Sequence, residues 1–225
     1  MCIRDRGKTY TQQEGGYQEN KQLAIALSGR KEKERWNSSP AKADFYTLKG
    51  QVLSLLERFG IENYQTTETT QDIFAYGLDI SLHKKPLVQL GEVAASISDH
   101  FSIDQPVFYA QFDADALYSY AHKTAVKVQD IPKFPSSRRD FALLVDKEIT
   151  FEALQKQAFQ VERKILKNVD LFDVYEGKNL PVGKKSYGLS FHFLDEKKTL
   201  TDKYIDKVMQ KMQQAFEKEF GASLR

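Results

Sequence analysis

Apolar positions follow no regular period at the start of the chain. Residues 1–20 are rich in glutamine, glycine and charge, which predicts an irregular segment. The first apolar run is Leu23–Leu27, which predicts a short strand. The best-marked helix is predicted over Asp44–Gly60, where apolar side chains recur at helical spacing. Asp44 is a good N-cap for this helix, and Gly60 can take the left-handed conformation that ends it.

Beyond this helix the apolar positions change to the spacing of strands. Three strands and a closing helix are predicted at Ile73–Leu82, Leu87–Ala95, Val107–Phe112 and Ala114–Ala121. One helix, a run of strands and a further helix indicate an α+β layer on a largely antiparallel sheet. We assign this first module to residues 21–126, and a linker to residues 127–133, where Pro132 lies and the periodicity is lost.

The clearest pattern lies in residues 134–225, where the predicted order is strand–helix–strand–strand–helix–strand. The predicted elements are strands at Asp140–Val145, Val169–Tyr175 and Ser186–Leu194, helices at Phe151–Leu166 and from Thr199 or Thr201 to Gly221, and the start of a last strand at Ala222–Arg225. In the third strand, large apolar side chains alternate with Ser186, Gly188, Ser190 and His192. This is the order of a ferredoxin-like βαββαβ domain, whose two helices cover one face of the sheet and leave the other face exposed for binding.

Composition supports a folded protein and narrows its class. Of the 225 residues, 41% are hydrophobic and 28% are charged with both signs mixed, which is typical of globular domains. No apolar run has the length of a membrane span and no signal peptide is evident, so we expect a cytoplasmic protein without a membrane partner. The single cysteine, Cys2, excludes a disulfide framework.

Charge is distributed unevenly along the chain. Residues 40–115 carry 5 basic and 11 acidic side chains, whereas residues 134–225 carry 17 basic and 14 acidic ones. This difference in charge is consistent with a protein in which only the C-terminal domain binds a polyanion. Ordinary scatter of solvated charges explains it equally well.

The sequence offers candidates for binding but not for catalysis. It contains no glycine-rich phosphate loop and no metal-binding motif, and its four histidines are far apart, so we predict no catalytic residue and no metal ligand. Cations that neutralise phosphates, beside aromatic rings that stack on bases, suit single-stranded RNA. We expect such residues to converge at one edge of the C-terminal sheet, with the lysines in the loop between its central strands. The predicted RNA-binding residues are Phe134, Arg138, Arg139, Tyr175, Lys178, Lys184 and Lys185.

These residues lie in segments that carry a family resemblance. In the last domain they are FPSSRRDFALLVD (134–146), VDLFDVYEG (169–177), LPVGKKS (180–186) and FLDEKKTLTD (193–202). They resemble the C-terminal, ferredoxin-like, tRNA-binding domain of bacterial phenylalanine–tRNA ligase beta subunits. Upstream, LAIALSGR (23–30), DFYTLKG (44–50) and LVQLGEV (87–93) are similar to the class-II-synthetase-like module of the same subunit.

The resemblance implies a part of a ligase that joins phenylalanine to its tRNA at the expense of ATP. In that family two alpha and two beta subunits form the enzyme, the alpha subunit carries the aminoacylation site, and the beta module supports assembly. The expected partners are the anticodon stem-loop of phenylalanine tRNA and the alpha subunit. ATP and magnesium are implied for the whole ligase, and no cofactor is expected in this chain.

The residues themselves argue against catalysis by this chain. Class II synthetases hold ATP with arginines, because a planar guanidinium grips phosphate and stacks on adenine. Between Arg58 and Arg138 the sequence has no arginine, so the first module is predicted to be a scaffold. The alternative function is an ACT-type regulatory module, a ferredoxin-like domain that binds a small metabolite. Such a module would not need the basic residues at 138, 139, 184 and 185.

Overall fold

The structure is a computed structural model, and it describes residues 2–33, 35–37, 41–62, 64–121 and 131–225. The chain divides into two compact units, Met1–Val128 and Gln129–Arg225, each with its own hydrophobic core. The predicted linker at residues 127–133 spans this division, and residues 127–130 of it lie outside the described part of the chain. None of the described helices is long and apolar enough to cross a membrane.

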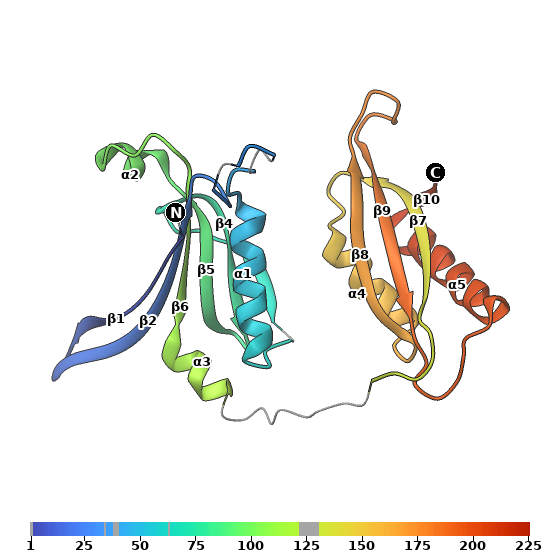
Figure 1. The fold of residues 1–225 in the computed structure, drawn as a ribbon, viewed down its shortest axis with the longest axis horizontal. Coiled ribbons are helices and arrows are strands. Elements are labelled where there is room, and N and C mark those ends of the chain that lie inside the picture. The colour runs from blue at the N-terminus through green and yellow to red at the C-terminus, as the bar shows by residue number, and fades with distance from the viewer. Residues whose placement is uncertain (1, 34, 38–40, 63, 122–130) are drawn as a thin grey trace. The chain divides into compact units, whose positions relative to one another are not determined.

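The first unit is a six-stranded antiparallel sheet in the order β1-β2-β6-β5-β4-β3, with α1 and α3 packed against it (Figure 1). Its elements are β1 (Cys2–Gln13), β2 (Gly16–Ser28), α1 (Phe45–Arg58), β3 (Gln65–Glu68), β4 (Phe74–Leu82), β5 (Lys85–Val93), α2 (Ala95–His100), β6 (Val107–Asp113) and α3 (Ala114–Ala121). Leu48, Val52 and Leu56 of α1 and Leu117 of α3 lie in one core with the apolar positions of the central strands. The predicted α+β layer is thereby confirmed. The structure also contains a short polar strand, β3, that the sequence pattern did not predict.

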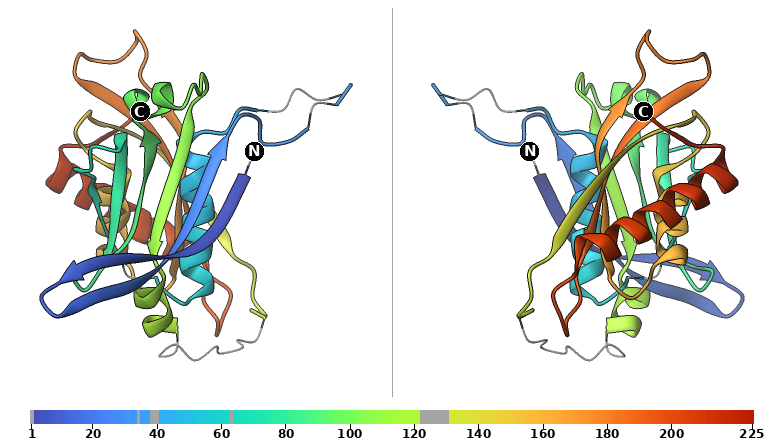
Figure 2. Two further views of the ribbon diagram at one scale, coloured as in Figure 1. Left: turned by 90° about the vertical axis from the view of Figure 1, so that its left-hand side faces the viewer. Right: turned by 90° about the vertical axis from the view of Figure 1, so that its right-hand side faces the viewer.

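β1 and β2 form a long hairpin that extends beyond the rest of the first sheet (Figure 1 and Figure 2). It is paired without a break from Cys2 opposite Leu27 to Gln13 opposite Gly16. The prediction of an irregular segment over residues 1–20 was therefore wrong. Every side chain of β1 is exposed, so this strand has no buried face and shows no apolar alternation. Backbone pairing with β2 holds it in place.

Helix α1 begins and ends as its sequence predicts. The backbone N–H of Thr47 donates to the carboxylate of Asp44 at 2.7 Å, which satisfies a free donor of the first turn. Gly60, just after the helix, has a φ of 70°. The turn between β4 and β5 is made by His83 and Lys84, which both have positive φ.

The second unit has the predicted ferredoxin-like fold. Its elements are β7 (Ser137–Asp146), α4 (Phe151–Val161), β8 (Leu166–Tyr175), β9 (Lys184–Phe193), α5 (Asp202–Phe220) and β10 (Ser223–Leu224). The strands lie in the order β10-β7-β9-β8, and each pairs antiparallel with its neighbours. Leu154 and Ala158 of α4 and Met212 and Phe216 of α5 join the buried strand residues in one core, so both helices lie on the same face of the sheet (Figure 1). No helix of the described residues 131–225 lies on the other face.

Two boundaries in this unit differ from the prediction, and the second affects the site. Helix α4 ends at Val161 rather than Leu166, because Leu166 enters the core from the first position of β8. Strand β9 begins two residues earlier than predicted. Lys184 and Lys185 pair with the end of β7 and belong to the sheet, whereas the sequence pattern had placed them in a loop. Helix α5 begins after Thr201 and ends at Gly221, whose φ is 58°, as predicted.

Candidate nucleic-acid interface

The face of the C-terminal sheet that points away from α4 and α5 is called the open face below. Along β9, Tyr187, Leu189 and Phe191 lie in the core, so the residues between them point the other way. Strand pairing places residues of β7 and β8 beside them. The open face comprises Arg138, Asp140, Ala142 and Leu144 of β7, Ser186, Gly188, Ser190 and His192 of β9, Asn168, Asp170, Phe172 and Tyr175 of β8, and Arg225, which follows β10 and lies beside Ala142.

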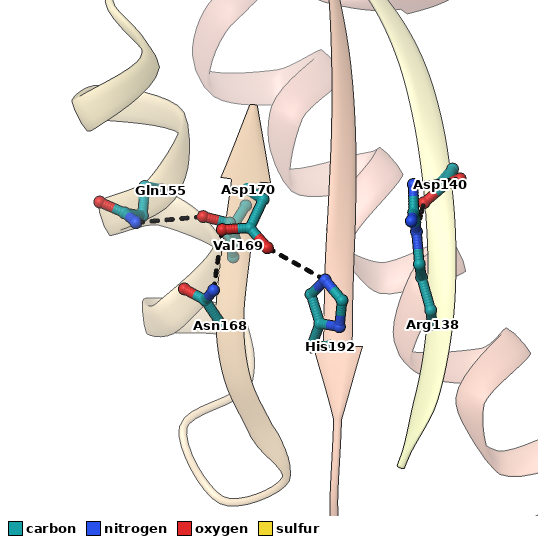
Figure 3. A network of polar contacts seen from close by, with 7 residues as sticks. All are labelled: Arg138, Asp140, Gln155, Asn168, Val169, Asp170 and His192. Carbon is teal, nitrogen blue, oxygen red and sulfur yellow. Dashed lines mark hydrogen bonds and ion pairs between the residues drawn. The ribbon is translucent and has the colours of Figure 1, made fainter. Parts of the chain in front are cut away.

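A network of charged and polar side chains lies at one end of the open face (Figure 3). Arg138 donates two hydrogen bonds to Asp140, from Nε to Oδ1 at 2.8 Å and from Nη2 to Oδ2 at 3.1 Å. Across the sheet, Asp170 accepts a hydrogen bond from the Asn168 amide at 2.8 Å, and its other oxygen lies 3.1 Å from Nε2 of His192. On the helix side, the Gln155 amide donates to a backbone carbonyl of β8 and ties α4 to this strand.

The paired arginine changes the acidity of its partner. Hydrogen bonds from Arg138 hold the pKa of Asp140 below its ordinary value, and the same contact raises the pKa of Arg138. Both groups are therefore charged throughout the physiological pH range. Because the carboxylate already takes two N–H groups of Arg138, less of that guanidinium is available to a ligand.

Two arginines of the open face also lie over aromatic rings. The guanidinium carbon of Arg138 is 5.6 Å from the centre of the Phe172 ring, and that of Arg225 is 4.9 Å from the centre of the Tyr175 ring. The Phe172 ring lies over Gly188, where a Cβ atom would come within 2.7 Å of it. Glycine at this position in β9 therefore leaves the space that the ring occupies.

The structure brings three of the seven predicted RNA-binding residues to the open face or its end. Arg138 and Tyr175 lie on it, as described. Lys184 is at the beginning of β9, directly opposite Asp146 of β7, and its Nζ is 3.0 Å from that carboxylate. Lys178 is exposed in the turn between β8 and β9, and Phe134 lies half-buried before β7 begins.

The other two predicted residues point to the opposite face. Arg139 forms an ion pair of 2.5 Å with Asp202 and lies 3.8 Å from Asp206, both on α5. Lys185 is almost fully buried, with its Nζ 4.6 Å from the centre of the Tyr187 ring. The seven predicted residues therefore do not converge at one edge of the C-terminal sheet. Successive residues of a strand point to opposite faces, so a basic pair within a strand is divided between them.

Several open-face residues were not among the predicted ones, namely Asp170, His192, Phe172 and Arg225. His192 could have been found, because the alternation of small and polar residues with large apolar ones in β9 indicates which of its residues point away from the core. Phe172 was harder to find. The pairing of β8 with β9 shifts register between Leu171 and Asp173, so simple alternation does not predict which face Phe172 takes.

Two family models match the chain and together define its class. Residues 132–225 match the ferredoxin-fold anticodon binding domain, and residues 5–114 match the phenylalanyl tRNA synthetase beta chain CLM domain. The first match coincides with the unit that carries the open face. The class is thus an aminoacyl-tRNA synthetase beta chain, with an anticodon-binding type of domain at its end.

Relatives with known names agree with this class. The chain is 37% identical to the phenylalanine–tRNA ligase beta subunit of Porphyromonas gingivalis and 38% identical to that of Bacteroides thetaiotaomicron, over 93% of its length in both cases. It is 32% identical to that of Geobacillus kaustophilus over 92% of its length. The chain belongs to the phenylalanine–tRNA ligase beta-subunit family, and the resemblance to the C-terminal part of that subunit is confirmed. It spans about a quarter (26%) of the length of these relatives.

One solved structure that the comparison matches to this chain is the pyrrolysyl-tRNA synthetase of Desulfitobacterium hafniense. It has a TM-score of 0.41 and 16% sequence identity, over 55% of this chain and 42% of that chain.

Proposed function

We propose that the C-terminal unit binds the anticodon stem-loop of phenylalanine tRNA through the open face. The first unit is proposed to support assembly with the alpha subunit in a ligase of two alpha and two beta subunits. Family membership supports tRNA as the partner. The choice of the open face as the binding surface rests on its two arginine–aromatic pairs. In the whole ligase, phenylalanine would be attached to tRNA by the alpha subunit in the cytoplasm.

The chemistry of the open face suits unpaired bases better than a regular duplex. Aromatic rings and guanidinium groups offer flat surfaces on which any base can stack. Carboxylates such as Asp140 and Asp170 repel phosphates but accept hydrogen bonds from the amino groups of bases. Lys178 and Lys184, at the end of the sheet where β8 turns into β9, are the proposed contacts to phosphates.

The described residues do not mark a site for magnesium, and the sequence after Arg58 in the first unit does not favour one for ATP. Among the described residues no group of three or more histidine, cysteine, aspartate or glutamate side chains is arranged to hold a metal ion. The sequence from Phe59 to Ser137 has no arginine to grip a triphosphate. ATP and magnesium are therefore proposed for the whole ligase only, with no step assigned to this chain.

Titration of the full chain with a labelled anticodon stem-loop of phenylalanine tRNA, and with a non-cognate one, tests the proposal. Phe172→Ala should weaken binding by about 1–3 kcal/mol with little change in salt dependence, since it removes a stacking ring. Lys184→Ala should lower the slope of log K against log salt by roughly 0.7–0.9, since it removes one phosphate contact. Lys211→Ala, an exposed position on α5, is the matched control and should bind like the wild type.

The results separate three cases. If the stem-loop binds and both open-face variants behave like the wild type, the open face is not the RNA site. If the chain does not bind the stem-loop at all, tRNA binding by this chain is wrong. Binding of a small metabolite together with edge-to-edge dimerisation would favour the ACT-type regulatory function instead.

A further inference from the structure

Two loops meet at the end of the C-terminal sheet where β8 begins and β9 ends. One comprises residues 162–165, between α4 and β8, and the other comprises residues 194–201, between β9 and α5. The backbone N–H of Leu194 donates to the carbonyl of Ile165 at 2.8 Å, so the two loops lie side by side. They are at the opposite end of the sheet from the turn that joins β8 to β9 (Figure 1).

Basic side chains are in excess on these loops. Residues 162–167 and 194–201 carry five basic and three acidic side chains, a net charge of +2. Four of the basic side chains are exposed and form no ion pair with a carboxylate of the described residues, and they are called the basic patch below: Arg163, Lys164, Lys197 and Lys198. Nε of Arg163 donates to the carbonyl of Phe159 at 3.2 Å, which holds this side chain at the end of α4 and uses one of its five N–H donors.

The carboxylates of the same loops are all occupied by local contacts. Glu162 accepts two backbone N–H groups of its own loop, at 2.7 and 3.2 Å. Asp195 accepts the backbone N–H of Lys197 at 2.9 Å, and Glu196 pairs with Lys167, whose Nζ lies 2.9 Å from the carboxylate. These contacts fix the shape of the loops and leave the charged heads of the basic patch to meet an anion from outside.

The basic patch suits phosphates better than bases. The two loops contain no aromatic residue on which a base could stack. Lysine heads and a guanidinium neutralise phosphates irrespective of sequence, and contacts of this kind position a nucleic acid without reading it. Double-helical RNA is bound mostly through its phosphates and 2′-hydroxyl groups, because its bases are hard to reach.

The distance along the sheet indicates which part of an RNA could reach the basic patch. Strand β8 has ten residues, so the two ends of the sheet are roughly 30 Å apart. The proposed phosphate contacts Lys178 and Lys184 lie at the end where β8 turns into β9. An RNA that places its unpaired loop beside them has to extend along the whole unit to reach the basic patch, and in a hairpin RNA the part that extends away from the loop is the stem.

We propose that the basic patch binds phosphates of the double-helical stem of the RNA whose loop lies on the open face. The proposal rests on the proposed function, since it assumes that the open face binds an RNA loop. Contacts to the stem carry no information on sequence and fix the direction in which the stem leaves the open face. The C-terminal unit would thus hold its RNA at two separate places.

The double variant Lys197→Ala/Lys198→Ala tests the proposal in the full chain. The probes are the labelled anticodon stem-loop of phenylalanine tRNA and a single-stranded RNA with the sequence of its loop alone, each titrated at several salt concentrations. For the stem-loop, the slope of log K against log salt should be lower by roughly 1.4–1.8, which is twice the value for one phosphate contact. For the single strand the slope should not change, because this RNA has no stem.

Two further variants make the comparison specific. The double variant Lys211→Ala/Lys218→Ala is the matched control, because it removes the same charge from exposed positions further along α5, and it should keep the wild-type slope with both RNAs. Phe172→Ala should weaken binding of both RNAs, since its ring is proposed to stack on unpaired bases. The patch variant keeps the backbone hydrogen bond to Asp195, so its melting temperature should match that of the wild type.

A wild-type slope of the patch variant with the stem-loop would overturn the proposal. An equal loss of slope with both RNAs would overturn it too, because the basic patch would then contact the loop and not the stem. Unchanged RNA binding with lost binding to the purified alpha subunit would make the basic patch a protein contact and also contradict it. If the patch variant behaves like the wild type while Phe172→Ala weakens binding, only this inference is wrong and the proposed function stands. If the wild-type chain does not bind the stem-loop, both are wrong.

Discussion

Asp140 shows how one carboxylate can fix an arginine on an otherwise open surface. It accepts hydrogen bonds from Nε and Nη2 of Arg138, while about half of each side chain remains exposed. The contact therefore orients the guanidinium over the Phe172 ring more than it stabilises the fold.

The pH dependence of Asp140 follows from its lowered pKa. Because the pKa is lower in the folded state than in the unfolded state, the stabilisation is present above about pH 4 and is lost as pH falls through the folded-state pKa. Asp140→Asn should lower the free energy of unfolding at pH 7 by less than about 1 kcal/mol. The difference from the wild type should shrink below pH 4, as measured by urea unfolding at several pH values. A difference that stays constant down to pH 2 would contradict this assignment.

Adjacent Arg139 should behave differently, because it points to the helix side. Arg139→Ala removes the ion pair with Asp202 at the start of α5 and should lower the free energy of unfolding by about 0.5–1 kcal/mol. Binding of the stem-loop should be unchanged, whereas Arg138→Ala should weaken it. Thermal unfolding and RNA titration of the two variants side by side measure both effects. Weaker RNA binding by the folded Arg139→Ala variant would count against the division of these residues between the two faces.

At the scale of elements, β9 is the strand that organises the C-terminal sheet. It lies between β7 and β8, contributes Leu189, Phe191 and Phe193 to the core, and keeps small residues on the open face. Gly188 matters most among these, since the Phe172 ring lies in the space that its missing side chain leaves.

Gly188→Ala tests the importance of this space. The added methyl group would lie 2.7 Å from the far edge of the Phe172 ring and 3.0 Å from the Cβ atom of Asp173, so stability should fall by about 1–3 kcal/mol. Stem-loop binding should fall by a similar amount to that of Phe172→Ala. Gly50→Ala in helix α1 is the matched control, because an added Cβ atom there would meet nothing within 4 Å. Unchanged RNA binding by Gly188→Ala would mean that the position of Phe172 does not matter for RNA.

The elements that sequence could predict are those with a buried face. Helix α5 has a stripe of buried residues from Ile205 to Phe216, a threonine before its first turn and a glycine after its last, so both its existence and its ends follow from local rules. Strand β1 has no buried face, and its pairing partner alone determines it. The same limit applies to the site. Arg225 and Tyr175 come from the two outer strands, β10 and β8, and no local pattern of the sequence indicates that their side chains meet.

At the scale of the whole molecule, the chain contains two separate cores. One is formed by residues between Ile25 and Leu117, and the other by residues between Leu143 and Ala222. The division at Val128 falls between them.

We therefore expect residues 129–225, prepared alone, to fold. Its core includes 18 buried residues, 15 of them in its two helices and three long strands, which is enough to support an independent domain. Circular dichroism and a cooperative thermal transition should match those of the same unit in the full chain, and the stem-loop should bind with the affinity of the full chain. Loss of folded structure in this fragment, with the full chain folded under the same conditions, would contradict the prediction.

The exposed hairpin at the start of the first unit has a consequence for aggregation. Strand β1 is at the edge of the six-stranded sheet, so one side of its backbone is open to pairing with any extended chain. Charged side chains at Arg4, Asp5, Arg6 and Lys8 lie along this edge, and burying them against a second strand would cost solvation energy. These four residues act as gatekeepers: a variant with threonine at all four positions would present a long, neutral, β-prone edge on which copies of the chain could stack into fibres.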